Sequence, residues 1–472
     1  MTASAHRIAV IGGGIAGLSA AHALLAARPD LQVTVYEANA SVGGKLRAGE
    51  VGGVTVDLGA ESMLNRRPEG LALAEAVGLE GDIVHPATSS AAIWTRGALR
   101  PLPPTLMGIP ADLAALAHSG ILTSAGMGRV SLERRLPEPD LSEDVGFGVL
   151  VARRLGRDVR DRLVEPLLGG VYAGRSDEIS LQAALPEVVT AIRTSGGLLN
   201  AARATRAQPG ASGGEREVFA GLRGGMARLP QATADQLERQ GVRVERNALV
   251  RTLTRTSNGW ELVVGTTTGH REDADAVVLA TPAPASAKLL HEAAPAAARE
   301  LAAIEYASLA IVTLAFGETD LRADLAGSGF LVPPIDKRVV KAATFSSSKW
   351  PWMSGDPTIV RCSIGRHGDE RDLQRDDSEL VDAALTDLKE ATGLHAPLLE
   401  AMVTRWGGAL PQYAVGHLDR VRRIEQSVED SPALAICGAA LGGVGIPAVI
   451  ASAQRAATRV IAQLESVETM EP

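Results

Sequence analysis

Cysteine is nearly absent from this sequence, since only Cys362 and Cys437 occur among its 472 residues. Two cysteines in separate apolar stretches are too few for a disulfide scaffold and lack the paired spacing of a zinc site. We predict that both are buried free thiols in a reducing compartment. The nine histidines are scattered without metal-ligand spacing, so no metal site is expected.

An excess of basic charge is also missing. The chain has 47 Lys and Arg residues against 55 Asp and Glu residues, which gives a net charge of −8 at pH 7. This balance argues against a general nucleic-acid binder. Aromatic residues make up only 3% of the chain, so a site built as a stacked aromatic cage is not expected.

Signals for export or membrane crossing are lacking too. The first residues have no basic start, long apolar stretch and cleavage site of the kind found in signal peptides. Residues 431–454 carry no charge and are long enough to span a bilayer, but four glycines and Pro447 interrupt them. We interpret this segment as a strand (Ala433–Cys437), a glycine turn and the start of a buried helix. No transmembrane helix and a cytoplasmic location are therefore expected.

The sequence does contain enough apolar residues, 46% of the total, for the sizeable core of a globular protein with two to four domains. At the N-terminus, Arg7–Ile11 and Leu31–Glu37 are predicted to be strands on either side of a helix at Ile15–Ala27. A G-x-G-x-x-G pattern, Gly12, Gly14 and Gly17, joins the first strand to the helix. Such glycines allow a tight turn, close approach of a pyrophosphate and close helix–strand packing, and Glu37 stands where an acid binds a ribose hydroxyl. A dinucleotide site is predicted.

A second glycine pattern near the C-terminus helps to identify the dinucleotide. Gly443-x-Gly445-x-x-Ala448 follows a predicted strand and opens a helix, but the chain ends at Pro472 without a further strand and acidic residue. We interpret this pattern as a helix N-terminus aimed at another part of the same cofactor. A ligand held by both ends of the chain suits FAD.

Other segments indicate the organisation of the middle of the chain. Residues 99–132 are apolar and proline-rich, which suggests either part of a substrate pocket or an exposed patch that touches a membrane or a partner. Residues 206–217 form the one low-complexity stretch, a mobile loop or linker. The remaining predicted elements are a helix at Asp144–Leu168, strands at Gly241–Leu253, Trp260–Val264 and Ala276–Ala280, antiparallel strands at Leu309–Phe316 and Thr358–Ile364, and a last helix at Ala448–Ser466.

Several segments resemble known flavoproteins. GGGIAGLSAAHAL, VYEANASVGGK, DLGAES (57–62), VVLATP (277–282) and CGAALGGVGIPAVIASAQRAA (437–457) resemble FAD-dependent amine oxidase-type enzymes. EPLLGGVYAG (165–174), FAGLRGGMARLP (219–230), ATFSSSKWPW (343–352) and RWGGALPQYAVGH (405–417) are similar to protoporphyrinogen/coproporphyrinogen oxidases. EPLLGGVYAG in particular resembles the soluble Gram-positive bacterial enzymes that oxidise coproporphyrinogen III.

The resemblance implies a set of FAD-binding residues. Those at the nucleotide end would be Gly12, Gly13, Gly14, Ile15, Ala16 and Gly17, with Glu37 and Ala38 at the ribose and the Val250 backbone at the adenine. Those towards the pyrophosphate and isoalloxazine would be Lys45, Gly59, Ala60, Glu61 and Ser62, and those at the flavin end Trp406, Val444, Gly445 and Ile446. Relatives outside this bacterial group can carry a basic residue at the position of Glu61. The acidic residue in this chain departs from that pattern, so the role of Glu61 is left open.

The fold implied by the resemblance is of the α/β class, α+β overall. It combines a Rossmann-like FAD-binding domain (1–85, 215–282 and 405–472), an antiparallel-sheet substrate domain (86–98 and 283–404) and a helical insertion (99–214). The implied function is the O2-dependent six-electron oxidation of coproporphyrinogen III to coproporphyrin III, with release of H2O2, in haem biosynthesis. The alternatives are oxidation of protoporphyrinogen IX, a flavin amine oxidase or carotenoid desaturase, and a non-catalytic flavoprotein that delivers porphyrin.

The sequence leaves two alternative roles open for several side chains. Lys341 and Lys349 either bind propionates of the substrate or are ordinary surface charges. Trp350 and Trp352 either face the macrocycle or pack in the core. Tyr413 is next to the flavin motif, and His417 has a structural role as its favoured interpretation. No catalytic side chain is assigned, and contacts with a membrane surface or with a haem-pathway enzyme such as a ferrochelatase remain open.

Overall fold

The predicted N-terminal unit is present in the computed structural model, which describes residues 6–207, 218–317 and 325–468. Strand β1 (Arg7–Ile11), helix α1 (Ile15–Ala27) and strand β2 (Gln32–Tyr36) follow one another, and β1 and β2 pair in parallel. The parallel sheet runs in the order β12-β2-β1-β16-β22, with β12 (Arg243–Glu245), β16 (Ala276–Leu279) and β22 (Leu434–Ile436). Apolar residues on both sides of these strands require cover on both faces.

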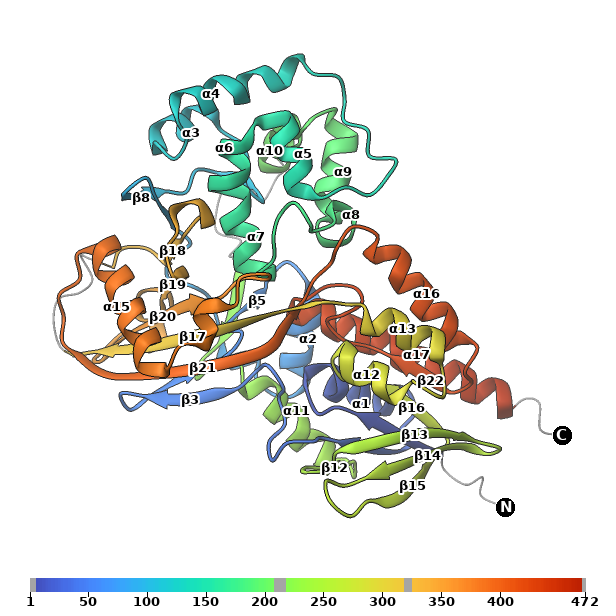
Figure 1. The fold of residues 1–472 in the computed structure, drawn as a ribbon. Helices are drawn as coiled ribbons and strands as arrows, with labels where there is room; N and C mark the ends of the chain where they lie inside the picture. The colour runs from blue at the N-terminus through green and yellow to red at the C-terminus, as the bar shows by residue number, and fades with distance from the viewer. Residues whose placement is uncertain (1–5, 208–217, 318–324, 469–472) are drawn as a thin grey trace.

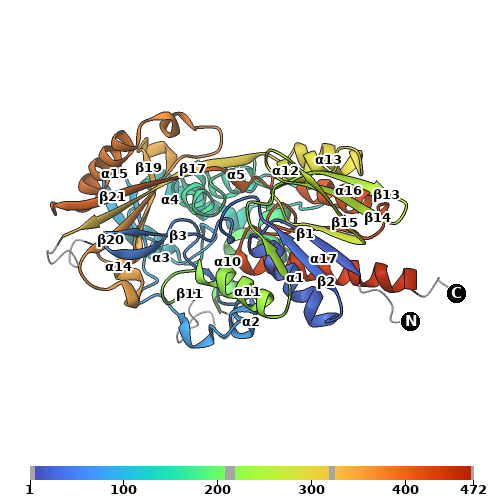
Figure 2. The same ribbon diagram turned by 90° about the horizontal axis from the view of Figure 1, so that it is seen from below.

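Alternate side chains of this sheet enter two separate cores. One core packs Ile8 and Val10 against α1, α11 (Arg228–Arg239) and α17 (Ile446–Glu468). The other packs Ala9 and Ile11 against a three-stranded sheet and against helices α12, α13 and α16. These are β13 (Val250–Thr256), β14 (Gly259–Val264), β15 (His270–Ala274), α12 (Ala283–Leu289), α13 (Pro295–Ala302) and α16 (His417–Glu429). Helices α1 and α17, from the two ends of the chain, lie side by side (Figure 2).

A second, largely antiparallel sheet lies beside the first. Its seven strands are β21 (Leu398–Pro411), β17 (Tyr306–Phe316), β20 (Thr358–Ile364), β19 (Val340–Phe345), β18 (Gly329–Leu331), β7 (Ala92–Thr95) and β8 (Ala98–Pro101), in that order. The two strands predicted for an antiparallel sheet, at Leu309–Phe316 and Thr358–Ile364, are confirmed, and β17 and β20 pair directly with each other. Helix α15 (Asp377–Thr392) covers one face with Leu380, Ala384 and Leu388.

Helices α3 to α10 form a layer above both sheets (Figure 1). They are α3 (Leu113–Ser119), α4 (Ser124–Ser131), α5 (Phe147–Leu155), α6 (Arg157–Val159), α7 (Glu165–Tyr172), α8 (Leu181–Ala184), α9 (Pro186–Ser195) and α10 (Leu198–Ala207). The prediction of one helix at Asp144–Leu168 was wrong, because Gly156, with φ +98°, ends α5 and a π-helical turn at Arg160–Val164 precedes α7. The proline-rich stretch at 99–132 supplies Ile109, Leu116 and Ile121 to the core of this layer.

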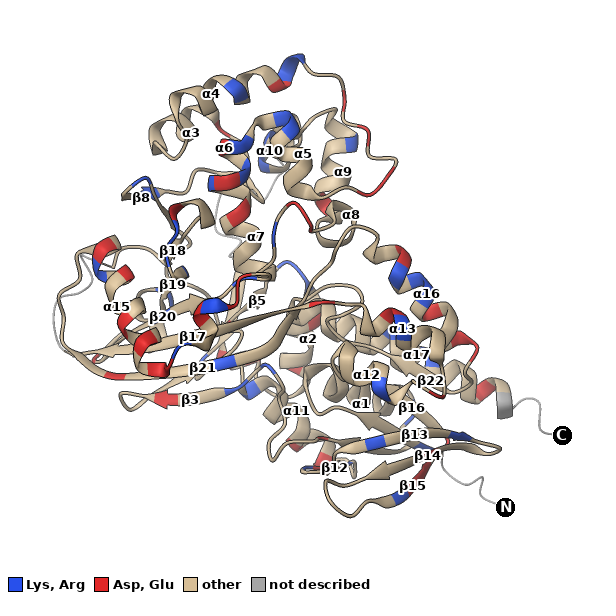
Figure 3. Cartoon of the chain, in the orientation of Figure 1, with Lys and Arg blue, Asp and Glu red and all other residues tan. Residues whose placement is uncertain are grey.

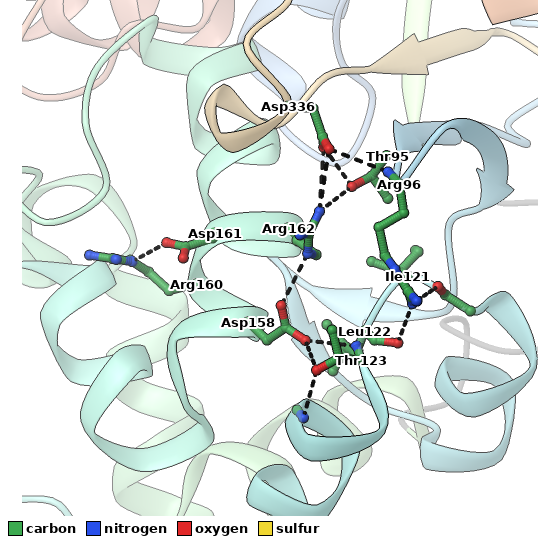
Figure 4. A network of polar contacts seen from close by, with 12 residues as sticks. Thr95, Arg96, Ile121, Leu122, Thr123, Asp158, Arg160, Asp161, Arg162 and Asp336 are labelled. Carbon is green, nitrogen blue, oxygen red and sulfur yellow. Dashed lines mark hydrogen bonds and ion pairs between the residues drawn. The ribbon is translucent and has the colours of Figure 1, made fainter.

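Polar contacts join the helical layer to the seven-stranded sheet (Figure 4). Arg162, in the π-helical turn, donates to the Thr95 hydroxyl at 2.6 Å and lies 3.5 Å from Asp336. Its Nε also donates to Asp158 at 3.0 Å, and Asp158 accepts the backbone N–H of Thr123 at 2.7 Å. These contacts fix the start of α7 relative to the sheet.

The remaining elements are short. They are β3 (Ala48–Val51), β4 (Val54–Asp57), β5 (Met63–Leu64), α2 (Pro68–Ala76), β6 (Ile83–Val84), β9 (Thr105–Leu106), β10 (Ile109–Pro110), β11 (Phe219–Leu222) and α14 (Ser346–Lys349). The predicted single strand at Gly241–Leu253 is instead β12 followed by β13, because the chain turns at Asn247, with φ +57°, from one sheet to the other. Most of the low-complexity stretch, residues 208–217, lies outside the described residues.

Charge and hydropathy patterns agree with this arrangement. Acidic and basic residues are interleaved along α16 and mixed over the rest of the view in Figure 3. Within the described ranges, none of the helices combines the length and apolar content needed to cross a membrane. The segment 431–454 forms β22, a glycine turn and the first part of α17, as predicted. Cys362 and Cys437 are buried and free, also as predicted.

Candidate functional site

The glycine turn after β1 brings the start of α1 against the sheet. Gly12 has φ +113°, and a Cβ on Gly17 would lie 1.8 Å from the Gly12 carbonyl oxygen. Only glycine fits this close approach. Glu37, at the end of β2, is 7% exposed and accepts the Gly13 N–H at 2.8 Å through Oε2. Its Oε1 accepts the backbone and side-chain N–H groups of Asn39 at 2.8 and 2.6 Å.

Donors for an anion are available at this turn. Helix α1 begins after Gly14 with no side-chain cap and no acidic residue in its first turn, so its N–H groups and positive dipole end are open to a ligand. Lys45 lies between this turn and the segment around Gly59, because the nearby Gly43 N–H donates to the Gly13 carbonyl at 2.8 Å. Its Nζ is 5.7 Å from the centre of the Tyr306 ring. Burial lowers the pKa of Lys45 to about 8, and no carboxylate in the described ranges forms an ion pair with it.

The segment predicted to contact the adenine adjoins Glu37. The Glu37 carbonyl accepts the Ala248 N–H at 2.8 Å, and the Asn39 carbonyl accepts the Asn247 N–H at 2.9 Å. Val250 follows at the start of β13 with its side chain buried. The structure therefore places residues 247–250 beside the acid expected at the ribose.

At the opposite end, Trp406 of β21 lies against the DLGAES segment. Its indole N–H donates to the Leu58 carbonyl at 2.8 Å. A Cβ on Gly59 would lie 3.4 Å from the Trp406 ring and 2.0 Å from the Lys45 carbonyl oxygen, which explains the glycine. Gly59 also accepts a hydrogen bond at 2.7 Å from the guanidinium of Arg361, on β20.

Glu61 is held between two cations. Its carboxylate lies 2.5 Å from both the Lys349 amine and the Arg361 guanidinium. Burial alone would raise the pKa of Glu61, but these two charges outweigh it and lower the pKa to about 2. Asp57 is also buried nearby, and its charge interacts with both Arg361 and Glu61. Two cations therefore face two carboxylates in this corner of the site.

The C-terminal glycine segment closes the site from the other side. Gly438, two residues after the end of β22, is buried, yet a Cβ there would meet no atom within 4 Å. An internal hollow therefore lies at the carboxyl edge of the parallel sheet. Tyr413 holds the following residues, since its hydroxyl donates to the Ala439 carbonyl and accepts the Gly443 N–H, both at 2.6 Å. His417 stacks on Tyr413 at 4.1 Å between ring centres. Val444 and Gly445 follow, and α17 begins at Ile446.

The features of this site fit the chemical parts of FAD. An uncapped helix N-terminus, an unpaired lysine and a hollow at the carboxyl edge of a parallel sheet match the anionic and flat parts of a dinucleotide. Among the residues with described positions, no three His, Cys, Asp or Glu side chains gather where they could hold a metal ion. The predicted residues around Gly12–Gly17 and Glu37 come together at one end, Glu61 and Trp406 lie at the other, and Lys45 lies between them.

The structure decides the roles of two side chains for which the sequence left two interpretations, and it shows two roles that the sequence did not indicate. Lys349 is neither free for a substrate nor a surface charge, because it pairs with Glu61. Trp350 is a core residue, 2% exposed and packed in the cluster of Val51, Val56 and Ile359. Arg361 was missed by sequence reasoning, because an arginine within a strand carries no motif. The bridging role of Tyr413 was missed because its partners lie 26 and 30 residues further along the chain.

Comparisons with known proteins agree on one family. The model of flavin-containing amine oxidoreductases matches residues 15–461. A coproporphyrinogen III oxidase of Mycobacterium tuberculosis is 38% identical over 466 residues, covering 97% of this chain and 98% of its own. A coproporphyrinogen III oxidase of Bacillus subtilis is 29% identical over 471 residues, with the same coverage. The crystal structure of a provisionally named protoporphyrinogen oxidase from Exiguobacterium superimposes with a TM-score of 0.86 at 30% identity, over 98% of this chain and 99% of the other.

Proposed function

The chain belongs to the flavin-containing amine oxidoreductase family and, within it, to the coproporphyrinogen III oxidases, and we propose from this premise that it oxidises coproporphyrinogen III to coproporphyrin III with bound FAD. The observation that carries the proposal is the end-to-end likeness to the mycobacterial enzyme. The likeness covers 97% of this chain, so it takes in nearly all of the elements described above. A flavin amine oxidase is less well supported, because EPLLGGVYAG and ALPQYAVGH would have no role in it.

The proposed reaction removes six electrons and six protons from the porphyrinogen, in three two-electron steps. FAD, when bound, supplies the acceptor for two electrons in each step, and three O2 molecules are reduced to three H2O2. The protein binds and orients the two molecules. The α1 N-terminus and Lys45 would hold the pyrophosphate, Glu37 the ribose, and the segment after Tyr413 the flavin end.

Glu61, Lys349 and Arg361 would act through charge rather than by proton transfer. Because the two cations hold the pKa of Glu61 at about 2, this carboxylate stays ionised and is a poor proton acceptor at neutral pH. We assign no side chain as a catalytic base.

We propose that the reaction takes place in the cytoplasm, supported by two buried free thiols that suit a reducing compartment. O2 as the final electron acceptor belongs to the same proposal. Contact with a membrane surface or with a later haem-pathway enzyme remains a sequence-based hypothesis.

The test mixes FAD-loaded protein aerobically with coproporphyrinogen III and, separately, with protoporphyrinogen IX, and follows porphyrin fluorescence. We expect porphyrin to form much faster than without protein, H2O2 to accumulate at three per porphyrin, and coproporphyrinogen III to be preferred. A preference for protoporphyrinogen IX would favour the alternative substrate. Flavin-loaded protein that accelerates neither reaction would contradict the oxidase proposal and favour a porphyrin-delivering role.

A further inference from the structure

Lys341 and Arg366 are two cations that none of the roles above uses. Lys341 lies on β19 and is only 5% exposed, with Nζ 3.4 Å from the Gly169 carbonyl of α7. Arg366 follows β20, is partly buried, and donates to the Val332 carbonyl at 2.9 Å. Burial lowers the pKa of Lys341 to about 7, and the like charge of Arg366 acts in the same direction.

Three other buried or partly buried cations of this protein have carboxylate partners, whereas Lys45, assigned above to the cofactor, has none among the described residues. Lys349 and Arg361 share Glu61, and Arg154 pairs with Glu133 at 2.8 Å. In the part of the chain that the structure describes, neither Lys341 nor Arg366 has a carboxylate oxygen within 4.0 Å.

The charges of Glu165, Asp369 and Asp372 act on Arg366, but none of these carboxylates forms an ion pair with it. Glu165, at the start of α7, accepts the Ser176 N–H at 3.0 Å and the Ser176 hydroxyl. Burying an unpaired ammonium beside a guanidinium is unfavourable, so the folded protein alone gives no reason for this pair.

A hollow adjoins the two cations. Gly169 is buried, yet a Cβ there would meet no atom within 4 Å outside its own helix backbone. Gly170, next to it, is exposed, and a Cβ there would meet only the Leu331 side chain, at 3.6 Å. The glycine pair of EPLLGGVYAG therefore leaves open space against the sheet where Lys341 emerges.

This hollow lies one helical turn from the flavin end. Ala173, directly after α7, packs with Leu309 and Ala409, and Trp406 packs against the same apolar cluster. Gly169 precedes Ala173 by four residues, a rise of about 6 Å along a helix. A flat apolar ring placed at Trp406 can thus direct an acidic side arm towards Lys341.

We propose that Lys341 and Arg366 bind one propionate carboxylate of the tetrapyrrole, an assignment that rests on the proposed function. The guanidinium offers a planar pair of N–H donors and the ammonium a third, so the carboxylate supplies the missing counter-charge. The apolar cluster with Trp406 then receives the ring, and the charged pair sets its orientation relative to the flavin end.

The test compares Lys341→Met with a matched control, Lys389→Met, in the FAD-loaded protein. Lys389 is an exposed lysine of α15, the helix that covers the same sheet, so both variants lose one positive charge. Fluorescence quenching measures the Kd of coproporphyrin III and of its tetramethyl ester, which has no carboxylates. Lys341→Met is expected to raise the Kd of the acid roughly 10- to 100-fold and to leave the Kd of the ester unchanged.

Three further readouts separate recognition from structure. The KM for coproporphyrinogen III should rise in Lys341→Met with kcat nearly unchanged. Its melting temperature should stay equal to that of the wild type or rise, since methionine removes an unpaired buried charge. Arg366→Gln should weaken acid binding similarly, which provides a second variant if the first does not fold.

Two results would overturn the assignment. One is wild-type affinity for the acid in both variants. The other is an equal loss for acid and ester together with a lower melting temperature, which would indicate a structural role. A wild type that neither oxidises coproporphyrinogen III nor binds coproporphyrin III would instead contradict the proposed function itself, a result visible without any variant.

Discussion

At the residue scale, Glu37 links the glycine turn to the loop after β2 through both carboxylate oxygens. We expect Glu37→Gln to lower FAD affinity roughly 10- to 100-fold, because one oxygen becomes an amide that faces the N–H donors of Gly13 or Asn39. Titration of apoprotein with FAD, followed by flavin fluorescence, measures the Kd. Glu50→Gln, at an exposed position of β3, is the matched control, and equal Kd values for both variants would contradict the role of Glu37.

His417 makes stability depend on pH. Burial lowers the pKa of His417 to about 4, below its usual value near 6.5 in an unfolded chain. As the pH falls, the unfolded state therefore binds a proton before the folded state does. The contribution of neutral His417 to the free energy of unfolding is fully present above pH 6.5 and is lost as the pH falls towards 4. The loss at pH 5 should be on the order of 2 kcal/mol.

Urea unfolding of the apoprotein at pH 8 and pH 5 measures this effect. His417→Phe keeps a ring on Tyr413 but cannot be protonated, so its stability should fall less over this interval, whatever its absolute value. Some dependence should remain, since burial also lowers the pKa of His22. His118→Asn, at an exposed position of α3, should keep the wild-type slope. An unchanged slope in His417→Phe would refute the assignment.

At the element scale, Arg162 connects the π-helical turn before α7 to the edge of the sheet (Figure 4). Its side chain is 13% exposed, so Arg162→Met leaves Asp158 and Asp336 without their shared cation in a poorly solvated region, although each keeps neutral hydrogen-bond donors. We expect a loss of about 1–3 kcal/mol in the free energy of unfolding. Denaturant unfolding compares it with Arg157→Met, an exposed neighbour whose loss should be within about 0.5 kcal/mol of zero.

Elements with local signals were predictable from the sequence. The ranges of β1 and α1 were correct to the residue, since an apolar run, a glycine turn and an Ala/Leu helix follow one another within 21 residues. The break in α5–α7 was not predicted, because the periodicity of apolar residues continues across Gly156 while the backbone does not. The pairings of Arg361 with Glu61 and of Arg162 with Thr95 join residues far apart in the chain, and no local pattern encodes them.

At the scale of the whole molecule, segments from both ends of the chain surround one candidate cofactor site. Ligand that binds only the folded state should stabilise it by about 2.7 kcal/mol at a concentration 100-fold above its Kd. We expect the melting temperature to rise with FAD concentration and to fall when the flavin is removed. FMN lacks the adenosine monophosphate half of FAD, which would reach Glu37. The same concentration of FMN should therefore raise the melting temperature much less. Equal shifts with FAD and FMN would contradict a cradle for the whole dinucleotide.

The order of strands in the parallel sheet also has a consequence for synthesis. Strand β1 lies between β2 and β16. The other edge of β16 pairs with β22, at Leu434–Ile436, which is synthesised last of the five strands. At about 5–20 residues per second, on the order of a minute separates the first strand from the last on the ribosome. Until β22 is synthesised, an apolar strand edge of the nascent chain is exposed and unpaired. Chaperones are expected to bind such an edge. A polypeptide released early, even by about forty residues, would lack the strand that completes the sheet and could not acquire its flavin.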